Sequence, residues 1–285
     1  MKGIILAAGR GTRLYPMTLP VCKPLLPVYD KPLIYYSLSV LMQAGISDVM
    51  IIIPPGEENT FNSLLGDGSQ LGMHISYRVQ KVARGIADAM LIGREFIGSD
   101  SVCLVLGDNI FYHPRLGDTL KEARKHSAGA RVFGYYVEDP RPFGVVEFDG
   151  TGRAISIEEK PRHPKSNYII PGIYFYDNQA IEIAENLKPS ARGELEITDV
   201  NLAYLKEDRL QVFPLDQNFA WMDAGTADSL LDAAYRIKQI QFDTGRYVGC
   251  IEELAYEAGW ITQDQVHALG EKLKKTLYGQ YLLCL

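Results

Sequence analysis

Three basic side chains near the start of the chain form a candidate site for a strongly negative ligand. Arg10, Arg13 and Lys23 are spaced along this stretch, and residues 1–29 contain no carboxylate. The whole chain has a formal net charge of −6, so this excess of positive charge is local. Such a concentration of basic groups favours a ligand that carries phosphates.

The same stretch contains glycines that allow the backbone to turn around such a ligand. Gly9 and Gly11 follow an apolar run, residues 2–6, that is typical of a buried strand. A glycine has no Cβ, so the backbone can approach a bulky anion closely. The dinucleotide-binding pattern GxGxxG fails because Leu14 stands in place of its third glycine, and the P-loop pattern is absent. The loop therefore indicates a different way of holding a triphosphate. The alternative interpretation is a glycine-rich turn whose arginines are solvated and bind no ligand.

Two carboxylates are candidates for a metal site. Asp108 and Asp223 each follow a short apolar run that predicts a strand, and ligands of open α/β sheets gather at the carboxyl ends of strands. Two carboxylates, completed by phosphate oxygens and water, suit Mg²⁺. Each aspartate also fits a turn or a helix cap, so both interpretations stay open at this point.

A third group of charged residues lies in the second half of the chain. Glu158, Glu159 and Lys160 end a predicted strand, where the lysine can face a phosphate and a glutamate can face a pair of sugar hydroxyls. Arg192 is another candidate phosphate ligand. The alternatives are an exposed, charged strand end and a solvated loop arginine.

The elements that must position these residues begin as an alternation of strands and helices. The strand at 2–6, a helix from Pro32 to just before Gly45 and a strand at 48–53 form a βαβ unit, which implies a parallel sheet. Further strands are predicted at 74–80, 101–106, 130–137, 210–214 and 219–222, and further helices at 57–65, 86–96, 116–127, 179–187 and 194–207. The order predicts an α/β fold with a mixed, mostly parallel sheet flanked by helices.

The pattern changes after Phe143. Two alternating strands around Asp149-Gly150 predict a β-hairpin. The predicted strand at 168–176 contains Pro171, which indicates either an edge strand or an irregular point facing a ligand.

The last sixty residues or so are predicted to be helical. Helices are expected at 227–242 and 252–258, and Thr262 with Gln265 forms a capping box that starts another. We therefore expect an α/β core over residues 1–226 and a C-terminal helical extension over 227–285.

Composition narrows the class of protein. In a chain of 285 residues, 47% are hydrophobic and 22% are charged, and a sequence pI near 5.5 argues against a nucleic-acid partner. No apolar stretch reaches the length of a membrane span, so no membrane partner is expected. The four cysteines form no CxxC pair and the histidines show no zinc-binding spacing. With no secretory signal in the sequence, a cytoplasmic protein with reduced thiols is expected.

Several motifs in order along the chain resemble those of the sugar-1-phosphate nucleotidylyltransferases, and most closely the glucose-1-phosphate thymidylyltransferases. They are LAAGRGTRL, CKPLLP, LLPVYDKPLIYY, LVLGDNIFY, FGVVEFD, EEKP, RGELEITD and AWMDAGT. The resemblance spans nearly the whole chain. It implies a Rossmann-like fold of the nucleotide-diphospho-sugar transferase type, in which residues 1–140 bind mainly the nucleotide and 141–226 mainly the sugar phosphate.

The resemblance also implies a reaction and a set of site residues. The reaction converts dTTP and glucose 1-phosphate to dTDP-glucose and pyrophosphate with Mg²⁺ as cofactor, as a first step toward deoxysugars such as dTDP-rhamnose. The implied catalytic residues are Arg13 and Lys23, and the implied metal ligands are Asp108 and Asp223. The implied nucleotide-binding residues are Leu6, Ala8, Gly9, Gly11, Gln80, Gly85 and Asp108, and the implied sugar-phosphate-binding residues are Gly144, Glu159, Lys160, Ile170 and Arg192.

The helical tail resembles the extension in which this family forms homotetramers and binds a regulatory end product. Gly117 and Glu257 stand where the family pattern has His and Arg, so feedback inhibition stays open. A preference for UTP or another sugar 1-phosphate is the leading alternative, because thymine differs from uracil by one methyl group worth about 0.8 kcal/mol. A non-catalytic nucleotide-sugar sensor is less favoured, because both aspartates and the loop lysine are present.

Overall fold

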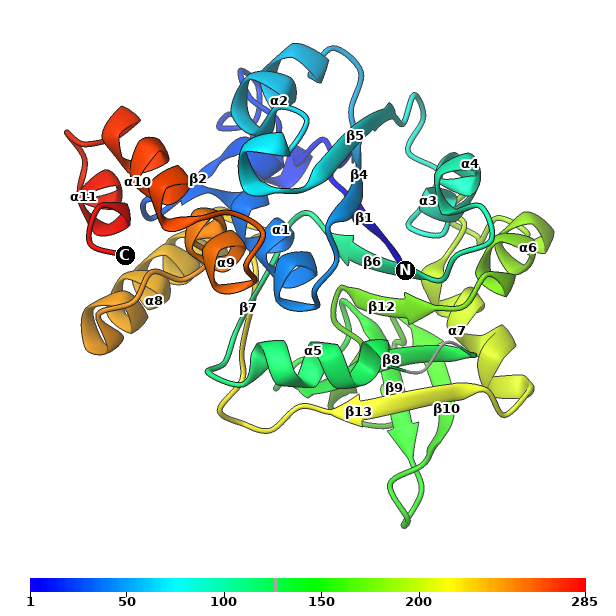
Figure 1. The fold of residues 1–285 in the computed structure, drawn as a ribbon. Coiled ribbons are helices and arrows are strands. Elements are labelled where there is room, and N and C mark those ends of the chain that lie inside the picture. The colour runs from blue at the N-terminus through cyan, green and yellow to red at the C-terminus, as the bar shows by residue number, and fades with distance from the viewer. Residues whose placement is uncertain (126–127) are drawn as a thin grey trace.

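A long mixed sheet forms the centre of the molecule (Figure 1). The computed structural model describes residues 1–125 and 128–285. Within them the strand order is β10-β9-β11-β8-β12-β6-β1-β4-β5, and β13 pairs with β8. The sheet is flanked by helices, so the predicted α/β class is confirmed.

The first half of the chain builds the parallel part of this sheet. Its strands are β1 (Lys2–Leu6), β4 (Asp48–Ile53), β5 (His74–Val79) and β6 (Val102–Leu106). β1 pairs in parallel with both β4 and β6, and β4 pairs in parallel with β5. These strands are runs of apolar residues because helices cover both faces of a parallel sheet.

The second half adds antiparallel strands beside β6. They are β8 (Ala130–Tyr136), β9 (Gly144–Phe148), β10 (Ala154–Glu159), β11 (Tyr168–Ile169), β12 (Ile173–Tyr176) and β13 (Leu210–Pro214). β12 pairs antiparallel with β6 and with β8, which joins the two halves into one sheet. The predicted hairpin is the β9–β10 pair.

A separate two-stranded ribbon begins just after the carboxyl end of the central strand β6. β7 (Asn109–Tyr112) pairs antiparallel with β14 (Ala220–Asp223), and Asn109 lies opposite Asp223. The ribbon thus brings residues that follow β6 together with the end of the α/β region. β7 was not predicted from the sequence.

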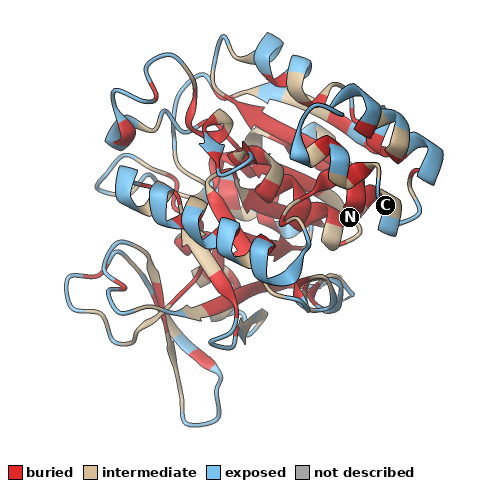
Figure 2. Cartoon of the chain, turned by 90° about the vertical axis from the view of Figure 1, so that its left-hand side faces the viewer, coloured by how far each residue is buried: buried red, intermediate tan, exposed pale blue. Residues whose placement is uncertain are grey.

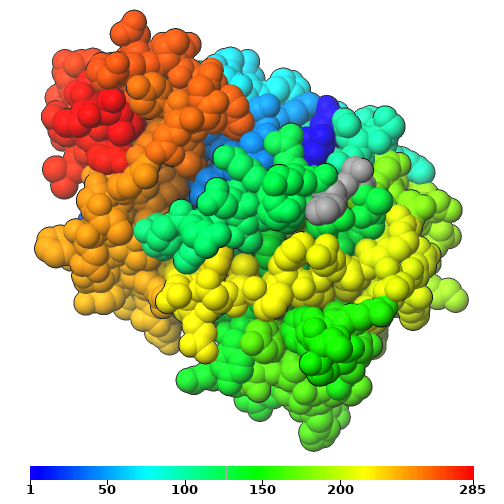
Figure 3. All heavy atoms as spheres, turned by 60° about the horizontal axis from the view of Figure 1, so that its bottom comes forward, coloured from blue at the N-terminus to red at the C-terminus, as the bar shows by residue number. Residues whose placement is uncertain are grey.

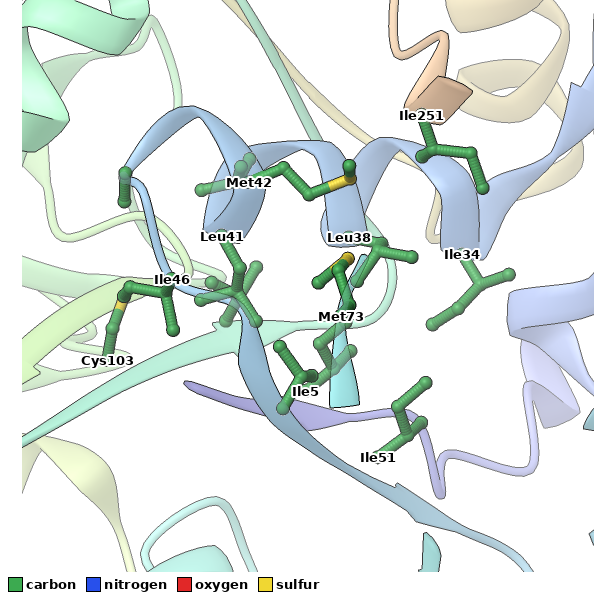
Figure 4. Close-up of a cluster of buried hydrophobic side chains, with 14 of the residues drawn as sticks. Ile5, Ile34, Leu38, Leu41, Met42, Ile46, Ile51, Met73, Cys103 and Ile251 are labelled. Atoms are coloured by element: carbon green, nitrogen blue, oxygen red, sulfur yellow. The ribbon is translucent and has the colours of Figure 1, made fainter. Parts of the chain in front are cut away.

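Two hydrophobic clusters enclose the sheet. Helix α1 (Leu33–Gln43) supplies much of one cluster, and Figure 4 shows its side chains above residues of β1 and β4. The residues labelled there include Ile5, Ile34, Leu38, Leu41, Met42 and Ile51, which are buried. The central strands and inner helix faces are buried while the outer helix faces are exposed (Figure 2).

The C-terminal helices gather on one side of the molecule (Figure 3). They are α8 (Ala227–Thr244), α9 (Ile251–Glu257), α10 (Gln263–Lys272) and α11 (Leu277–Leu282). The predicted capping box of Thr262 and Gln265 is present. None of the helices in the described ranges is long and apolar enough to cross a lipid bilayer.

Several predicted elements differ from those observed. The predicted helix 86–96 is two short helices, α3 (Asp88–Ile92) and α4 (Arg94–Ile97), separated by Gly93. A Cβ on Gly93 would lie 2.6 Å from Cδ1 of Ile4, so a side chain there would push the helices away from the sheet. The predicted strand 168–176 is interrupted at Pro171, because β11 ends at Ile169 and β12 starts at Ile173.

The remaining elements agree with prediction to within a few residues. Helices α2 (Glu58–Leu65), α6 (Gln179–Asn186) and α7 (Ile197–Lys206) are shorter than predicted at their ends. Helix α5 is Leu116–Arg124, and positions 126–127 of the predicted helix lie outside the described residues. Short elements that were not predicted are the 3₁₀ turns η1 (Thr12–Leu14), η2 (Lys23–Leu25) and η3 (Ser69–Leu71) and the strands β2 (Pro27–Val28) and β3 (Lys31–Pro32).

Candidate active site

The glycine loop connects β1 to η1 and leads the chain back toward Lys23. Gly11 has φ 62°, a left-handed conformation that favours glycine, and its carbonyl accepts a hydrogen bond of 2.7 Å from Oγ1 of Thr18. A Cβ on Gly11 would lie 3.0 Å from Cβ of Lys23. At Gly9 an added Cβ would meet nothing within 4 Å, so the start of the loop faces open space. The loop therefore combines an accessible backbone with a lysine held close behind it.

Lys23 is buried and paired with Asp108. The ammonium Nζ of Lys23 lies 2.6 Å from Oδ2 of Asp108. The other oxygen of Asp108 accepts a hydrogen bond of 2.8 Å from Nδ2 of Asn109. Gly107, just before the aspartate, packs on the loop, because a Cβ there would lie 3.0 Å from Cα of Ala7. This close packing fixes Asp108 beside the start of the glycine loop.

Asp223 lies next to the same charges. It ends β14, and a Cβ on Gly225 would be 2.6 Å from Oδ2 of Asp223 and 3.4 Å from Nη2 of Arg13. Burial raises the pKa of Asp223, and the charge of Asp108 raises it further, while Lys23 and Arg13 act in the opposite direction. Two carboxylates are therefore held near each other, with two cations close enough to influence them.

These groups border a cavity of about 190 Å³ between the two halves of the sheet. Its lining includes seven of the residues predicted for the site: Arg13, Asp108, Gly144, Glu159, Lys160, Ile170 and Asp223. Lys23 contacts the lining residue Asp108. Eight predicted residues do not line it: Lys23, Leu6, Ala8, Gly9, Gly11, Gln80, Gly85 and Arg192. The cavity thus joins the proposed metal ligands to the proposed sugar-phosphate residues.

The far side of the cavity is formed where β9, β10 and α7 meet. Oε2 of Glu159 accepts a hydrogen bond of 2.5 Å from Oγ1 of Thr198. A Cβ on Gly144 would lie 2.9 Å from that hydroxyl, so glycine is required for this contact. Lys160 follows with φ 46°, an uncommon conformation for a residue with a side chain, and it turns the chain at the cavity wall.

Arg192 is near this region but is bound to glutamates. Its Nη2 lies 2.8 Å from both oxygens of Glu196 and 3.2 Å from Oε1 of Glu159. Burial acts to lower the pKa of Arg192, but its hydrogen bond with Glu196 and the surrounding carboxylates raise the pKa overall. The guanidinium is therefore a permanent cation. It does not line the cavity, but it contacts Glu159, which does.

The segment from Gln80 to Asp88 links the two halves of the protein. Nε2 of Gln80 donates a hydrogen bond of 2.9 Å to Asp88, and Arg84 donates one of 2.6 Å to the other oxygen of that carboxylate. Gly85 has φ 103°, and a Cβ there would lie 2.4 Å from the carbonyl oxygen of Leu195. Gln80 thus hydrogen-bonds Asp88, and Gly85 packs against the backbone of Leu195. Their contact with the base stays a prediction.

Sequence reasoning missed several residues of the cavity lining. The chief ones are Asn109, Phe143, Tyr174, Thr198, Asn201 and Trp221. Nε1 of Trp221 donates a hydrogen bond of 2.6 Å to Oδ1 of Asn109, which braces the ribbon that carries Asp223. Asn109 and Trp221 stand beside the two aspartates in the motifs GDN and WMD, so those motifs contained a usable signal.

The arrangement suits chemistry between two polyanions. Cationic groups from Arg13, Lys23 and Lys160 can offset repulsion between phosphates. Among the described residues there is no group of three or more His, Cys, Asp or Glu side chains that could hold a metal ion. Two carboxylates alone leave most ligand positions to water and phosphate oxygens, which is the coordination that Mg²⁺ favours.

Comparison with known proteins identifies the class of enzyme. Residues 2–240 match the family model described as nucleotidyl transferase. The chain is 54% identical to the glucose-1-phosphate thymidylyltransferase of Neisseria gonorrhoeae, over 99% of this chain and 98% of the relative. It is 55% identical to that of Xanthomonas campestris pv. campestris, over 100% and 96% respectively.

A solved structure gives the same result. A Bacillus anthracis protein, named as a candidate glucose-1-phosphate thymidylyltransferase and bound to sucrose, has a TM-score of 0.77 and 44% identity, covering 83% of this chain and 94% of the other. The chain therefore belongs to the nucleotidyl transferase family, a family of enzymes. Within that family it groups with the glucose-1-phosphate thymidylyltransferases, as its motifs predict.

Proposed function

We propose that this enzyme transfers a thymidylyl group from dTTP to glucose 1-phosphate and releases pyrophosphate. A phosphate oxygen of the sugar phosphate forms a new bond to the α-phosphorus of dTTP, and the bond from that phosphorus to the pyrophosphate group breaks. The products are dTDP-glucose and pyrophosphate. Such a product can supply reactions that convert activated glucose into deoxysugars.

One observation carries the proposal: a single cavity is bordered at one end by Arg13, Asp108 and Asp223 and at the other by Glu159 and Lys160. This is the arrangement needed to bring a nucleotide triphosphate and a sugar phosphate together. The 54% identity with a glucose-1-phosphate thymidylyltransferase supports the choice of substrates.

The chain's own residues act by positioning and by electrostatic stabilisation. The sugar phosphate oxygen is already a nucleophile, so the enzyme has no need of a general base. Lys23 stabilises the negative charge that builds up around the α-phosphorus, and Arg13 holds the departing pyrophosphate. Lys160 binds the sugar phosphate and keeps its attacking oxygen in line. The glycine loop from Leu6 to Gly11 surrounds the triphosphate with backbone groups.

Mg²⁺ fits the two carboxylates of Asp108 and Asp223. Burial and the nearby charge of Asp108 raise the pKa of Asp223, although Lys23 and Arg13 oppose the rise, and this balance supports a site for added positive charge. A bound divalent cation would supply the missing positive charge and polarise the phosphate oxygens. We therefore assign these two residues as its protein ligands.

We also infer that the enzyme is a homotetramer that uses its C-terminal extension. Helix α8 exposes three large apolar side chains, Leu231, Tyr235 and Phe242, with 69%, 67% and 83% of their surfaces accessible. Their spacing along the helix puts them on one face. An exposed apolar stripe of this kind is typical of a protein interface, and a second copy of the chain is the partner that the family resemblance implies.

A pyrophosphate-release assay tests the proposed function. The purified enzyme is given glucose 1-phosphate with dTTP, UTP, CTP or GTP in the presence of Mg²⁺, and then dTTP with epimers of the sugar phosphate. We expect release with dTTP and glucose 1-phosphate to exceed that of every other pair. Faster release with UTP would favour the uridylyltransferase alternative, and no release with any pair would exclude the transferase reaction.

A further inference from the structure

Asn201 lies where the cavity meets the packed interior of the second half. Helix α7 contributes Ile197, Thr198 and Asn201 to the cavity lining. One turn further along, Tyr204 is fully buried. Asn201 is itself only 1% exposed, yet it carries a primary amide, which requires hydrogen-bond partners when it is buried.

The buried side of Asn201 is fixed by a tyrosine. The hydroxyl of Tyr176 donates a hydrogen bond of 2.6 Å to Oδ1 of Asn201. The Tyr176 ring stacks between Tyr174, at 6.1 Å between centroids, and Tyr204, at 5.7 Å. Burial raises the pKa of Tyr176, so the hydroxyl keeps its proton and stays a donor. The amide is therefore oriented with its oxygen toward the tyrosine stack.

The other end of the amide has no partner. Nδ2 of Asn201 is buried and makes no hydrogen bond to any residue that the structure describes. A buried donor without a partner is costly to the folded protein, so this atom is suited to a partner supplied by a ligand. Asn201 is one of the residues that line the cavity, so this unpartnered amide nitrogen belongs to a side chain that borders the cavity.

We propose that Nδ2 of Asn201 donates a hydrogen bond to a hydroxyl oxygen of the bound sugar and makes Asn201 a specificity-determining residue. This inference rests on the proposed function, because it requires a sugar phosphate in this cavity. The local chemistry favours a hydroxyl over the phosphate. Thr198 is uncharged and Glu159, its hydrogen-bond partner, is an anion, so this part of the cavity suits a neutral, hydroxyl-bearing group.

A set of deoxy substrates tests the inference. The kcat/KM of the intact enzyme is measured for glucose 1-phosphate and for its 2-, 3-, 4- and 6-deoxy analogues, with dTTP saturating. The same set is measured for Asn201→Leu, which keeps a similar volume but has no donor. We expect one analogue to be disfavoured about tenfold or more by the wild-type enzyme. That ratio should fall to near one in Asn201→Leu, while the KM for dTTP is unchanged.

Two tyrosine variants make the test independent of the asparagine substitution. Tyr176→Phe removes the hydroxyl that orients the amide, so the same ratio should fall severalfold. Tyr204→Phe is the matched control, because Tyr204 belongs to the same stack but donates its hydrogen bond of 2.6 Å to Asp177. Its ratio should equal that of the wild type. Thermal unfolding confirms that each variant is folded.

The outcomes separate this inference from the proposed function. If wild-type enzyme does not use glucose 1-phosphate at all, the proposed function fails. If it does, but every variant keeps all four wild-type ratios, then Nδ2 serves only a bound water or nothing, and the inference is wrong. A ratio lost in Tyr204→Phe as well as in Tyr176→Phe would also contradict it, since that would indicate a general packing effect.

Discussion

The ammonium of Lys23 lies 2.6 Å from a carboxylate oxygen of Asp108, although 85 residues separate them in sequence. The contact joins the glycine loop, which follows β1, to the end of the neighbouring strand β6. It couples a group proposed to stabilise the reacting phosphate to a group proposed to bind Mg²⁺. The two tasks therefore depend on one contact, and a change in either residue is expected to affect the chemical step.

Replacement of Lys23 should slow the reaction itself. We expect Lys23→Ala to lower kcat about 100-fold or more, by comparison with removal of one donor that stabilises transition-state charge. Initial rates of pyrophosphate release measure this. Lys274→Ala is the matched control, because Lys274 is an exposed lysine that pairs with Glu271 on the C-terminal helix, and its kcat should be unchanged. Near-normal turnover of Lys23→Ala would contradict the role given to the lysine.

Replacement of Asp223 should weaken the use of Mg²⁺. Asp223→Asn removes one of the two proposed metal ligands, so we expect turnover to fall about 100-fold or more at a fixed Mg²⁺ concentration. The concentration of Mg²⁺ that gives half-maximal velocity should rise. Asp232→Asn, at an exposed position on α8, should leave the Mg²⁺ dependence unaltered. An Asp223→Asn enzyme with the wild-type Mg²⁺ curve would show that the metal is bound elsewhere.

Substitution of Gly85 should lower the stability of the fold more than it weakens nucleotide binding. A Cβ at this position would meet the Leu195 carbonyl at 2.4 Å, and φ is 103°. We expect Gly85→Ala to lower the free energy of unfolding by more than about 3 kcal/mol, from backbone strain and overpacking together. Urea unfolding measures the loss.

Gly245→Ala is the control for backbone strain alone. Gly245 has φ 68° and ψ 5°, a left-handed conformation, but a Cβ there would meet nothing within 4 Å, so a loss of about 1 kcal/mol is expected. Equal losses in the two variants would mean that the close approach to Leu195 adds nothing. A stable Gly85→Ala enzyme with a raised KM for dTTP would instead favour direct contact with the base.

Glu252 should make stability depend on pH. Burial raises its pKa above the ordinary value of 4.5, against an opposing hydrogen bond from Tyr278. The folded protein therefore holds this proton more tightly than the unfolded chain, so Glu252 should cost stability as pH rises from 4.5 through the raised pKa. Glu252→Gln lacks this titration.

The difference between the two proteins isolates the effect. The free energy of unfolding of wild type, minus that of Glu252→Gln, is expected to decrease with rising pH across that window. Urea unfolding at a series of pH values gives the difference directly. Parallel curves would mean that Glu252 titrates in the folded protein as it does in the unfolded chain.

The exposed face of α8 should control assembly. Leu231→Lys and Phe242→Lys place charges in the proposed interface, so sedimentation velocity should show smaller species than the tetramer proposed for the wild type. Val82→Lys is the control, because Val82 is also exposed, at 65%, but lies far from α8 in sequence. A wild-type monomer, or tetramers in all three variants, would contradict the proposed interface.

Much of the fold followed from local patterns. The apolar runs at 2–6, 48–53 and 101–106 predicted the parallel strands, and the positions of Asp108 and Asp223 at strand ends predicted that they would meet. Other features depend on contacts that no local pattern encodes. Gly93, which separates α3 from α4, packs so closely on Ile4 that an added Cβ would lie 2.6 Å from Cδ1 of Ile4.

The cavity lining also includes a residue whose hydrogen-bond partner cannot be predicted from local sequence. Asn201 lies four residues after Ile197 and three before Tyr204, so helical spacing puts it on the buried face of α7. The sequence does not reveal its partner, because the Tyr176 hydroxyl comes from a strand 25 residues earlier. The strand at 219–222 was predicted and corresponds to β14, but its partner β7 was missed, since β7 has only four residues and lies far from β14 in sequence.

Isotope transfer tests the central claim most directly. Glucose 1-phosphate labelled with ¹⁸O in its phosphate group is incubated with dTTP, Mg²⁺ and the enzyme, and both products are analysed by mass spectrometry. If the sugar phosphate attacks the α-phosphorus of dTTP, all of the label will appear in dTDP-glucose and the pyrophosphate will be unlabelled. Labelled pyrophosphate, or consumption of dTTP without labelled dTDP-glucose, would contradict the proposed reaction.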